Sequence, residues 1–122
     1  MTHTITISKC DNELYLVACN SSGSYQLAHI QSGNRNAVNV VVTISPGSYV
    51  EPPTYNGVGG PLNESYGVSV PSGDYQLVAF GVDWGGVWYF SFTFQGQQPD
   101  SGENPTQHTG VVWVPPVQAF SV

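Results

Sequence analysis

The placement of glycine and proline along the chain is the feature that most restricts its fold. No window places apolar residues at positions i, i+3, i+4 and i+7 without an interrupting Gly or Pro, so the sequence does not support a long amphipathic helix. Instead, short runs alternate apolar with polar side chains and are rich in Val, Ile and aromatic residues. The sequence therefore predicts an all-β protein.

The predicted strands lie between turns rich in Gly, Pro, Asn, Asp and Ser. They cover residues 2–8, 13–19, 25–30, 37–44, 66–70, 74–82, 86–94 and 110–114, and an apolar segment, 117–122, closes the chain. Two long turn-rich segments, 49–65 and 95–109, interrupt the series. About eight short strands without crossover helices favour an antiparallel two-sheet β-sandwich, with a small β-barrel as the alternative. With 122 residues, the chain is expected to form one domain, 1–122.

One short phrase occurs twice, as Ser22-Gly-Ser-Tyr25-Gln-Leu27 and Ser72-Gly-Asp-Tyr75-Gln-Leu77, and residues 46–49 repeat its opening. The glycine frees a turn, and the tyrosine that starts the strand brings a hydroxyl that can bond back to a loop, as in a tyrosine corner. Residues 73–77 resemble the Gly-x-Tyr-x-Leu strand start of immunoglobulin-like and transthyretin-like bacterial sandwich modules. This resemblance implies the sandwich and, as a tendency of the class, adhesion or ligand display.

The composition excludes several classes of partner. Only 8% of the residues are charged, and 2 basic against 8 acidic residues give a net charge of -6, which disfavours nucleic acid and anionic membranes. No apolar run reaches the roughly 18–20 residues of a transmembrane span, and no classical signal peptide begins the chain. We therefore expect a cytoplasmic protein or one exported by another route. Cys10 falls in a predicted turn and Cys19 at the far end of the strand that follows, whose seven residues span about 20 Å, which predicts two free thiols.

Catalytic and metal-binding patterns are weak in this sequence. Nearly all the carboxylates fall in turns or loops, the three histidines show no metal spacing, and no nucleophile elbow or phosphate loop is present. A glycosidase needs two carboxyl groups at a set separation, which a sequence does not reveal. We expect a binding protein rather than an enzyme, with no required cofactor. Calcium held by Asp100, Glu103 and neighbouring amides is the alternative.

The strongest candidate for a binding site is the turn that carries Asp83 and Trp84. In the strand that follows, Trp88, Phe90, Phe92 and Phe94 share one face and are expected in the core, whereas Trp84 falls in the turn itself. An indole beside a carboxylate and flexible glycines can stack on a sugar ring while the carboxylate accepts hydrogen bonds from its hydroxyls. The competing interpretation is that Trp84 folds back and caps the sandwich.

Further candidates surround the two long turn-rich segments. They are Tyr55, Asn56, Asn63, Glu64 and Tyr66 near the first segment, and His108 and Trp113 after the second. If the two segments converge, they form a wet surface rich in aromatic and amide groups, which resembles the binding loops of a lectin or an antibody. The site residues of this interpretation are then Asp83, Trp84, Tyr55, Asn56, Asn63, Glu64, His108 and Trp113.

Three functions are compatible with these features. The first is a lectin-like protein that binds a glycan or glycoprotein. The second is a structural or self-assembling protein that forms homo-oligomers through edge strands or the apolar segment 117–122. The third is a small membrane-active defence protein, against which the acidic charge argues because anionic lipid would repel it.

Overall fold

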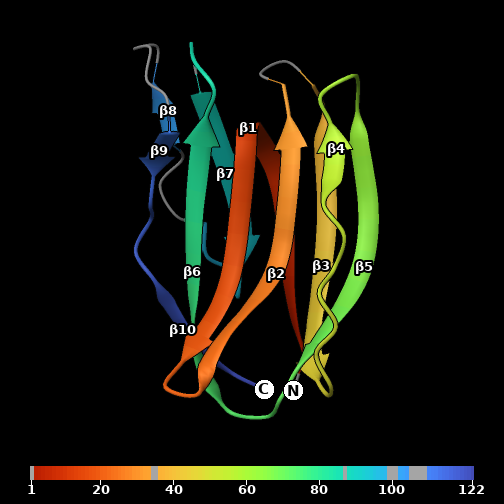
Figure 1. Cartoon of the computed structure of the whole chain (residues 1–122), viewed down its shortest axis with the longest axis vertical. Helices are drawn as coiled ribbons and strands as arrows, with labels where there is room; N and C mark the ends of the chain where they lie inside the picture. The colour runs from red at the N-terminus through yellow and green to blue at the C-terminus, as the bar shows by residue number, and fades with distance from the viewer. Residues whose placement is uncertain (1, 34–35, 87, 99–101, 105–109) are drawn as a thin grey trace.

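The chain is all-β in a computed structural model that describes residues 2–33, 36–86, 88–98, 102–104 and 110–122 (Figure 1). Residues 102–104 are described by their backbone only. Ten strands lie within these residues, and no helix does. The strands are β1 (His3–Asn20), β2 (Gly23–Ser32), β3 (Val38–Pro46), β4 (Tyr55–Gly57), β5 (Leu62–Val70), β6 (Asp74–Asp83), β7 (Trp88–Phe94), β8 (Gly102–Asn104), β9 (Gly110–Trp113) and β10 (Gln118–Ser121).

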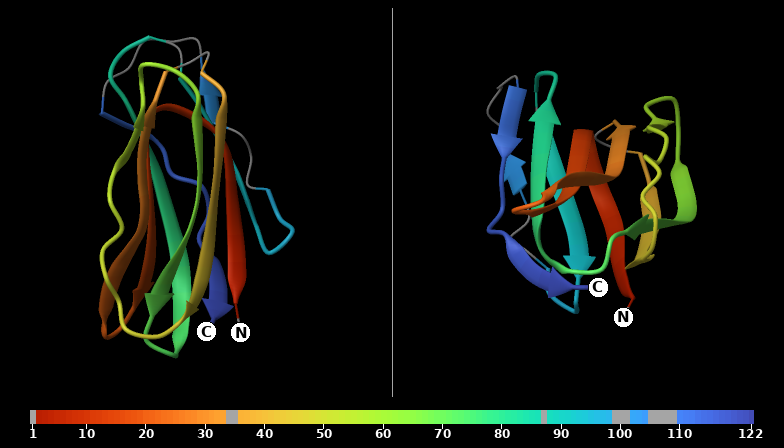
Figure 2. Two further views of the ribbon diagram at one scale, coloured as in Figure 1. Left: turned by 90° about the vertical axis from the view of Figure 1, so that its right-hand side faces the viewer. Right: turned by 60° about the horizontal axis from the view of Figure 1, so that its bottom comes forward.

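Strand β1 organises the fold because it belongs to both sides of the molecule. Its first half pairs with β3 and β7, and its second half pairs with β2 and β6. Between them the chain bends over one end of the molecule, and the register against β7 shifts between Ile7 and Lys9 (Figure 2). The sequence predicted two strands with a turn at residues 9–12, whereas the structure continues the pairing through this bend.

The bend also inverts the alternation of side chains along β1. Odd-numbered Ile5 and Ile7 are buried before the bend, and even-numbered Leu14, Leu16 and Ala18 are buried after it. One extra residue in a strand moves every following side chain to the opposite face. The extra residue lies at the register shift between Ile7 and Lys9, so even-numbered side chains face the core from Cys10 onward and both halves of β1 bury their apolar side chains.

The strands form one connected, mixed sheet that curls around the core as a half-barrel. We name the side formed by β5, β3, the first half of β1, β7 and β8 the first wall. The second wall consists of β4, β2, the second half of β1 and β6, with β9 and β10 along the outer edge of β6. The predicted all-β class is confirmed, the small-barrel alternative fits the curled sheet, and separate sandwich sheets are not confirmed.

Two parallel pairs distinguish this sheet from the antiparallel arrangement expected from the sequence. β2 pairs with β4, and β3 pairs with β5, in parallel. Parallel neighbours require a connection of a dozen or more residues that returns the chain to the starting end of the first strand. Residues 47–61 make that return, so that Leu62 starts β5 beside Val38 at the start of β3. The first long turn-rich segment is therefore a crossover, and it contains the short strand β4.

Aromatic side chains fill the core between the walls. The four alternating aromatic residues of β7 are 0–7% exposed, as their shared face predicts. Phe90 stacks on Trp113 of β9 with ring centroids 5.6 Å apart, and it packs directly over Gly81 of β6. A Cβ atom at Gly81 would lie 2.5 Å from the Phe90 ring, so only glycine leaves room for this packing.

The repeated Gly-x-Tyr phrase brings three tyrosines together at the end of the molecule opposite the β1 bend. Tyr25 lies 5.1 Å from Tyr49 and 6.0 Å from Tyr75 between ring centroids. The glycine two residues before each tyrosine has a φ of 152° to 159°, which L side chains rarely adopt. The Tyr75 hydroxyl donates to the carbonyl of Pro71 at 2.6 Å, which is the bond back to a loop that the sequence predicted.

Candidate functional site

The outer surface of the second wall carries a cluster of aromatic and polar side chains. Leu14 and Leu16 of β1 point into the core, so Glu13 and Tyr15, which alternate with them along the strand, point outward. The strand register places Gln31 and His29 of β2 opposite Glu13 and Tyr15, and places Phe80 of β6 opposite Tyr15. Together with Trp84, which follows β6, these side chains form what we call the Glu13 face: Glu13, Tyr15, His29, Gln31, Phe80 and Trp84.

Glu13 is the centre of the hydrogen bonds on this face. Its Oε2 atom accepts hydrogen bonds from Tyr15 Oη at 3.2 Å and Gln31 Nε2 at 3.2 Å, and it lies 2.7 Å from His29 Nε2. Its Oε1 atom accepts a hydrogen bond from Trp84 Nε1 at 2.7 Å. Burial raises the pKa of Glu13, but the four hydrogen bonds together outweigh it and hold the pKa below its usual value. The carboxylate is therefore charged at neutral pH.

Three rings of the Glu13 face stack on one another. Tyr15 lies between His29, at 4.0 Å and an interplanar angle of 14°, and Phe80, at 4.8 Å and 17°. The face of the Tyr15 ring is thus covered on both sides, and burial raises its pKa, with further contributions from the charge of Glu13 and the hydrogen bond to it. A ligand would therefore contact the edges of these three rings. The stacking fixes the positions of the Tyr15 hydroxyl and the His29 ring nitrogens.

Trp84 is held at the surface by two hydrogen bonds. Its backbone N–H donates to Asn12 Oδ1 at 2.8 Å, and its indole N–H donates to Glu13. The indole is 47% exposed and stacks on no other ring among the described residues. Gly85 and Gly86 follow with φ values of 131° and 88°, a backbone path that favours glycine. Trp84 is therefore a partly exposed, oriented ring rather than a cap buried over the core.

The carboxylate of Asp83 does not share this surface. Asp83 is 1% exposed, and neither of its carboxylate oxygens has a hydrogen-bond partner in the described part of the chain. In β6 the odd-numbered residues from Tyr75 onward point inward, and Asp83 is the last of that series. The acceptor beside the indole is Glu13, which the sequence analysis did not select. Its outward position next to Tyr15 in an alternating strand was the available signal.

The first long segment meets the Glu13 face along β4. The parallel pairing of β4 with β2 places Tyr55 beside Ile30 and Asn56 beside Gln31. Thr54 Oγ1 lies 2.9 Å from His29 Nδ1, so hydrogen bonds run continuously from Trp84 through Glu13 and His29 to this segment. Asn56 is exposed at the edge of the face, and its Oδ1 atom accepts a hydrogen bond from the backbone N–H of Val58 at 2.9 Å.

Tyr55 and Tyr66 have a structural place in this region. Tyr55 is half-buried, with its ring centroid 5.2 Å from that of Tyr66. The Tyr66 hydroxyl donates to the carbonyl of Leu27 at 2.8 Å and so joins β5 of the first wall to β2 of the second. Burial raises the pKa of Tyr66, which keeps this hydroxyl protonated.

The remaining predicted site residues lie elsewhere. Asn63 and Glu64 belong to β5, where Asn63 Oδ1 accepts a hydrogen bond from Asn39 at 3.4 Å. Among the described residues, no hydrogen bond, ion pair or ring contact joins either of them to the Glu13 face. Trp113 is 9% exposed and packs in the core against Phe90. His108 lies outside the described residues, as do Asp100 and the side chain of Glu103, the predicted calcium ligands.

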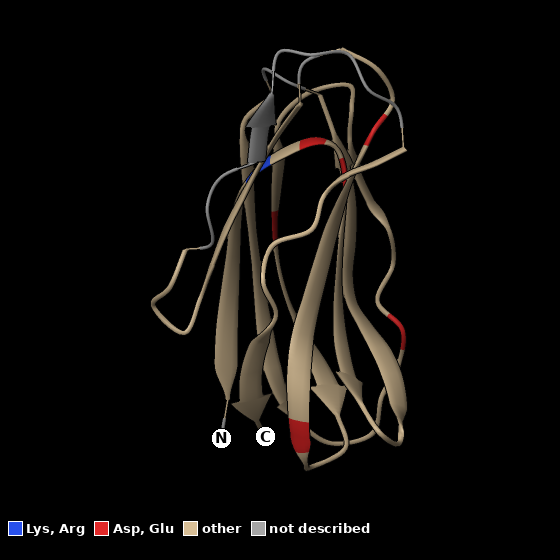
Figure 3. Cartoon of the chain, turned by 90° about the vertical axis from the view of Figure 1, so that its left-hand side faces the viewer, with Lys and Arg blue, Asp and Glu red and all other residues tan. Residues whose placement is uncertain are grey.

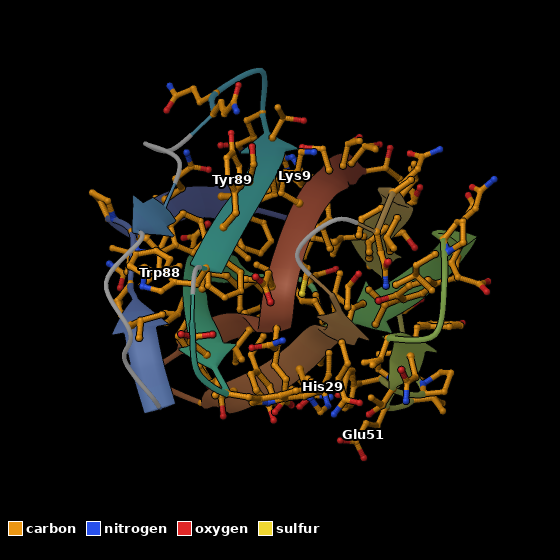
Figure 4. All side chains as sticks on the ribbon, turned by 90° about the horizontal axis from the view of Figure 1, so that it is seen from above. Lys9, His29, Glu51, Trp88 and Tyr89 are labelled. Carbon is orange, nitrogen blue, oxygen red and sulfur yellow. The ribbon has the colours of Figure 1, made fainter. Side chains whose placement is uncertain are left out.

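Charge is sparse and unevenly distributed over the molecule. Acidic positions lie near the end where β1 bends and also farther down the molecule and at its opposite end, and the basic position drawn lies beside the bend (Figure 3). Lys9 lies on the first wall, with its Nζ atom 5.8 Å from the centroid of the Tyr89 ring, on the side opposite His29 (Figure 4). The Glu13 face is therefore a weakly acidic surface that offers hydrogen-bonding groups and one exposed ring.

Both cysteines are free thiols, as their spacing predicts; Cys10 is buried and Cys19 is partly exposed. Within the described residues, no helix is long and apolar enough to cross a membrane. Comparisons of the chain with protein-family models, curated proteins and solved structures found no match.

Proposed function

We propose that the protein binds carbohydrate on the Glu13 face, with the Trp84 indole as the stacking surface. The observation that carries this proposal is the state of Trp84, which is 47% exposed and yet fixed by two hydrogen bonds. Exposing a large apolar ring to water is unfavourable, and fixing it in one orientation lowers the entropy lost when a ligand stacks on it. Such a ring is suited to the C–H face of a sugar.

The groups around the indole are suited to sugar hydroxyls. Among the described residues, the Gln31 side chain makes one hydrogen bond, from an N–H to Glu13, which leaves its second N–H and its carbonyl oxygen for a ligand. Asn56 uses its oxygen within the β4 turn, and its two N–H donors bond to no described group. The Thr54 hydroxyl completes a row of polar groups along the edge of the face. Each of these groups can donate or accept a hydrogen bond, as the hydroxyl groups of an uncharged sugar require.

Glu13 has an orienting role in this proposal rather than a direct one. Its carboxylate already takes part in four short contacts, which is close to the number of lone pairs that two carboxylate oxygens provide. It holds the indole of Trp84 and the amide of Gln31 in place for the ligand. The net charge of -6 disfavours anionic glycans, so neutral sugars are the expected class. In this arrangement the two walls act as the layers of a sandwich, and the site lies on one outer layer.

A glycan array followed by calorimetry tests this proposal. Trp84→Ala should abolish or strongly weaken the binding of any glycan found, without loss of folding, because the indole is half exposed. Tyr89→Ala is the matched control, since Tyr89 is a partly exposed ring on the opposite wall. Glu13→Gln should weaken binding less than Trp84→Ala, because it loosens the indole but does not remove it. The absence of binding to any neutral glycan, or equal affinity in Trp84→Ala, would contradict the proposal.

Self-association is a second candidate function, favoured by a separate observation. Three valines along the C-terminal segment are exposed: Val111 by 59%, Val114 by 62% and Val117 by 49%. This segment lies along the edge strands β9 and β10, whose described pairing is to β6. Unpaired edges with apolar side chains favour association with another chain.

Light scattering of a Val114→Lys variant against the wild type tests this second candidate. Val114 is exposed in the monomer, so a lysine there should leave folding intact and shift a wild-type oligomer toward monomer. Deleting residues 117–122 is a poorer test, because it removes Phe120, which is 5% exposed in the core. A wild-type protein that stays monomeric at high concentration would exclude this function.

A further inference from the structure

Two buried carboxylates lie near the end of the molecule where β1 bends. Asp11 lies in the bend and is 4% exposed, and Asp83 ends β6 and is 1% exposed. Glu13 pairs with Val82, and Asn12 Oδ1 accepts a hydrogen bond from the backbone N–H of Trp84, so the two aspartates lie near each other. Burial, and then the charge of Asp83, raise the pKa of Asp11 to about 6. Both oxygens of Asp83 lack a hydrogen-bond partner in the described part of the chain.

An unpaired buried carboxylate is unstable unless a proton or a cation compensates its charge. The described basic side chains near this end are already engaged elsewhere. Lys9 lies over the Tyr89 ring on the outside of the first wall, and His29 is bonded to Glu13 on the outer surface of the second. Neither of these groups compensates Asp11 and Asp83.

We propose that Asp11 and Asp83 together bind a hard divalent cation of the Ca²⁺ class. Carboxylate oxygens are the ligands that such cations prefer, and two of them balance the charge of the ion. Backbone carbonyls and water complete the six to eight oxygens that Ca²⁺ takes. This pair is distinct from the Asp100 and Glu103 site that the sequence suggested, and it does not depend on the proposed carbohydrate function.

The affinity expected for this site is modest. The described residues contain no group of three or more His, Cys, Asp or Glu side chains arranged to hold a metal ion, so the protein supplies two charged ligands. Calcium sites with few charged ligands bind with a Kd on the order of 10⁻⁴ to 10⁻³ M. Asn12, which follows Asp11, accepts a hydrogen bond from the backbone N–H of Trp84, which follows Asp83. A bound cation would therefore join the β1 bend to the turn that carries Trp84.

Terbium luminescence tests this site directly, because a bound Tb³⁺ ion is sensitised by a nearby indole and Trp84 directly follows Asp83. The wild type should show Tb³⁺ luminescence that Ca²⁺ displaces, and Ca²⁺ should raise its Tm. Asp11→Asn and Asp83→Asn should each weaken Tb³⁺ binding by about tenfold or more, since each removes one of two charged ligands. Glu51→Gln is the matched control, because Glu51 is an exposed carboxylate and should leave binding unchanged.

The outcomes separate a cation from a shared proton. Loss of Tb³⁺ binding in both aspartate variants, with wild-type affinity in Glu51→Gln, supports the site. Unchanged binding in Asp83→Asn overturns it, and so does a wild type that gives no Ca²⁺-displaceable luminescence and no Ca²⁺-dependent rise in Tm. Circular dichroism in a chelator checks that the variants fold. If either variant fails to fold, the wild-type measurements with Ca²⁺ and chelator still decide the question.

Discussion

The buried Asp11 carboxylate gives the protein a predicted pH dependence that one substitution removes. Burial, and then the charge of Asp83, raise the pKa of Asp11 from an ordinary 3.8 to about 6. A group with a raised pKa binds its proton more tightly in the folded state, so its contribution to stability is complete below the ordinary value and is lost as the pH rises through about 6. A shift of about two units, at about 1.4 kcal/mol per unit, corresponds to about 3 kcal/mol.

Urea unfolding in the presence of a chelator measures this effect. We expect the free energy of unfolding of the wild type to fall relative to Asp11→Asn by up to about 3 kcal/mol between roughly pH 4 and pH 7, because asparagine does not ionise. Carboxylates that do not interact with Asp11 contribute equally to both proteins, and their effects cancel in the difference. Glu51→Gln, which removes an exposed carboxylate, should track the wild type. A difference between wild type and Asp11→Asn that stays constant over this range would refute the argument.

Two further predictions concern the core and the thiols. Gly81→Ala should lower the free energy of unfolding by about 1–3 kcal/mol in the same urea assay, because the added Cβ overpacks against Phe90. Gly67→Ala is the control: the nearest atom lies 3.8 Å from the added Cβ, so its free energy of unfolding should stay within about 0.5 kcal/mol of the wild type. Burial raises the pKa of the Cys10 thiol, so a thiol reagent should modify the partly exposed Cys19 rapidly and Cys10 only on unfolding; mass spectrometry of the labelled peptides distinguishes them. Equal labelling rates in the folded protein would contradict the placement of Cys10.

The strand content of this fold is readable from local pattern, whereas the way the strands join is not. Alternation in residues 2–8 and 13–19 identified the two halves of β1, because each half buries one face. The turn residues between them did not reveal that pairing continues through the bend, since that depends on β3 and β7 meeting one half and β2 and β6 the other. The parallel pairs were missed for a related reason. Residues 47–61 have the composition of a loop, and their return to the start of β3 is a tertiary property.

The same alternation of inward and outward side chains predicts different positions for Glu13 and Asp83, the two acidic residues near Trp84. In β6 the inward positions are odd-numbered and end at Asp83, so the strand itself directs this carboxylate into the core. In the second half of β1 the inward positions are even-numbered, so Glu13 must point outward, to the side on which Trp84 emerges. Proximity in sequence to the indole favoured Asp83, but strand geometry assigns the surface role to Glu13. The same geometry leaves Asp83 buried near Asp11, where two buried carboxylates favour a proton or a cation over a sugar.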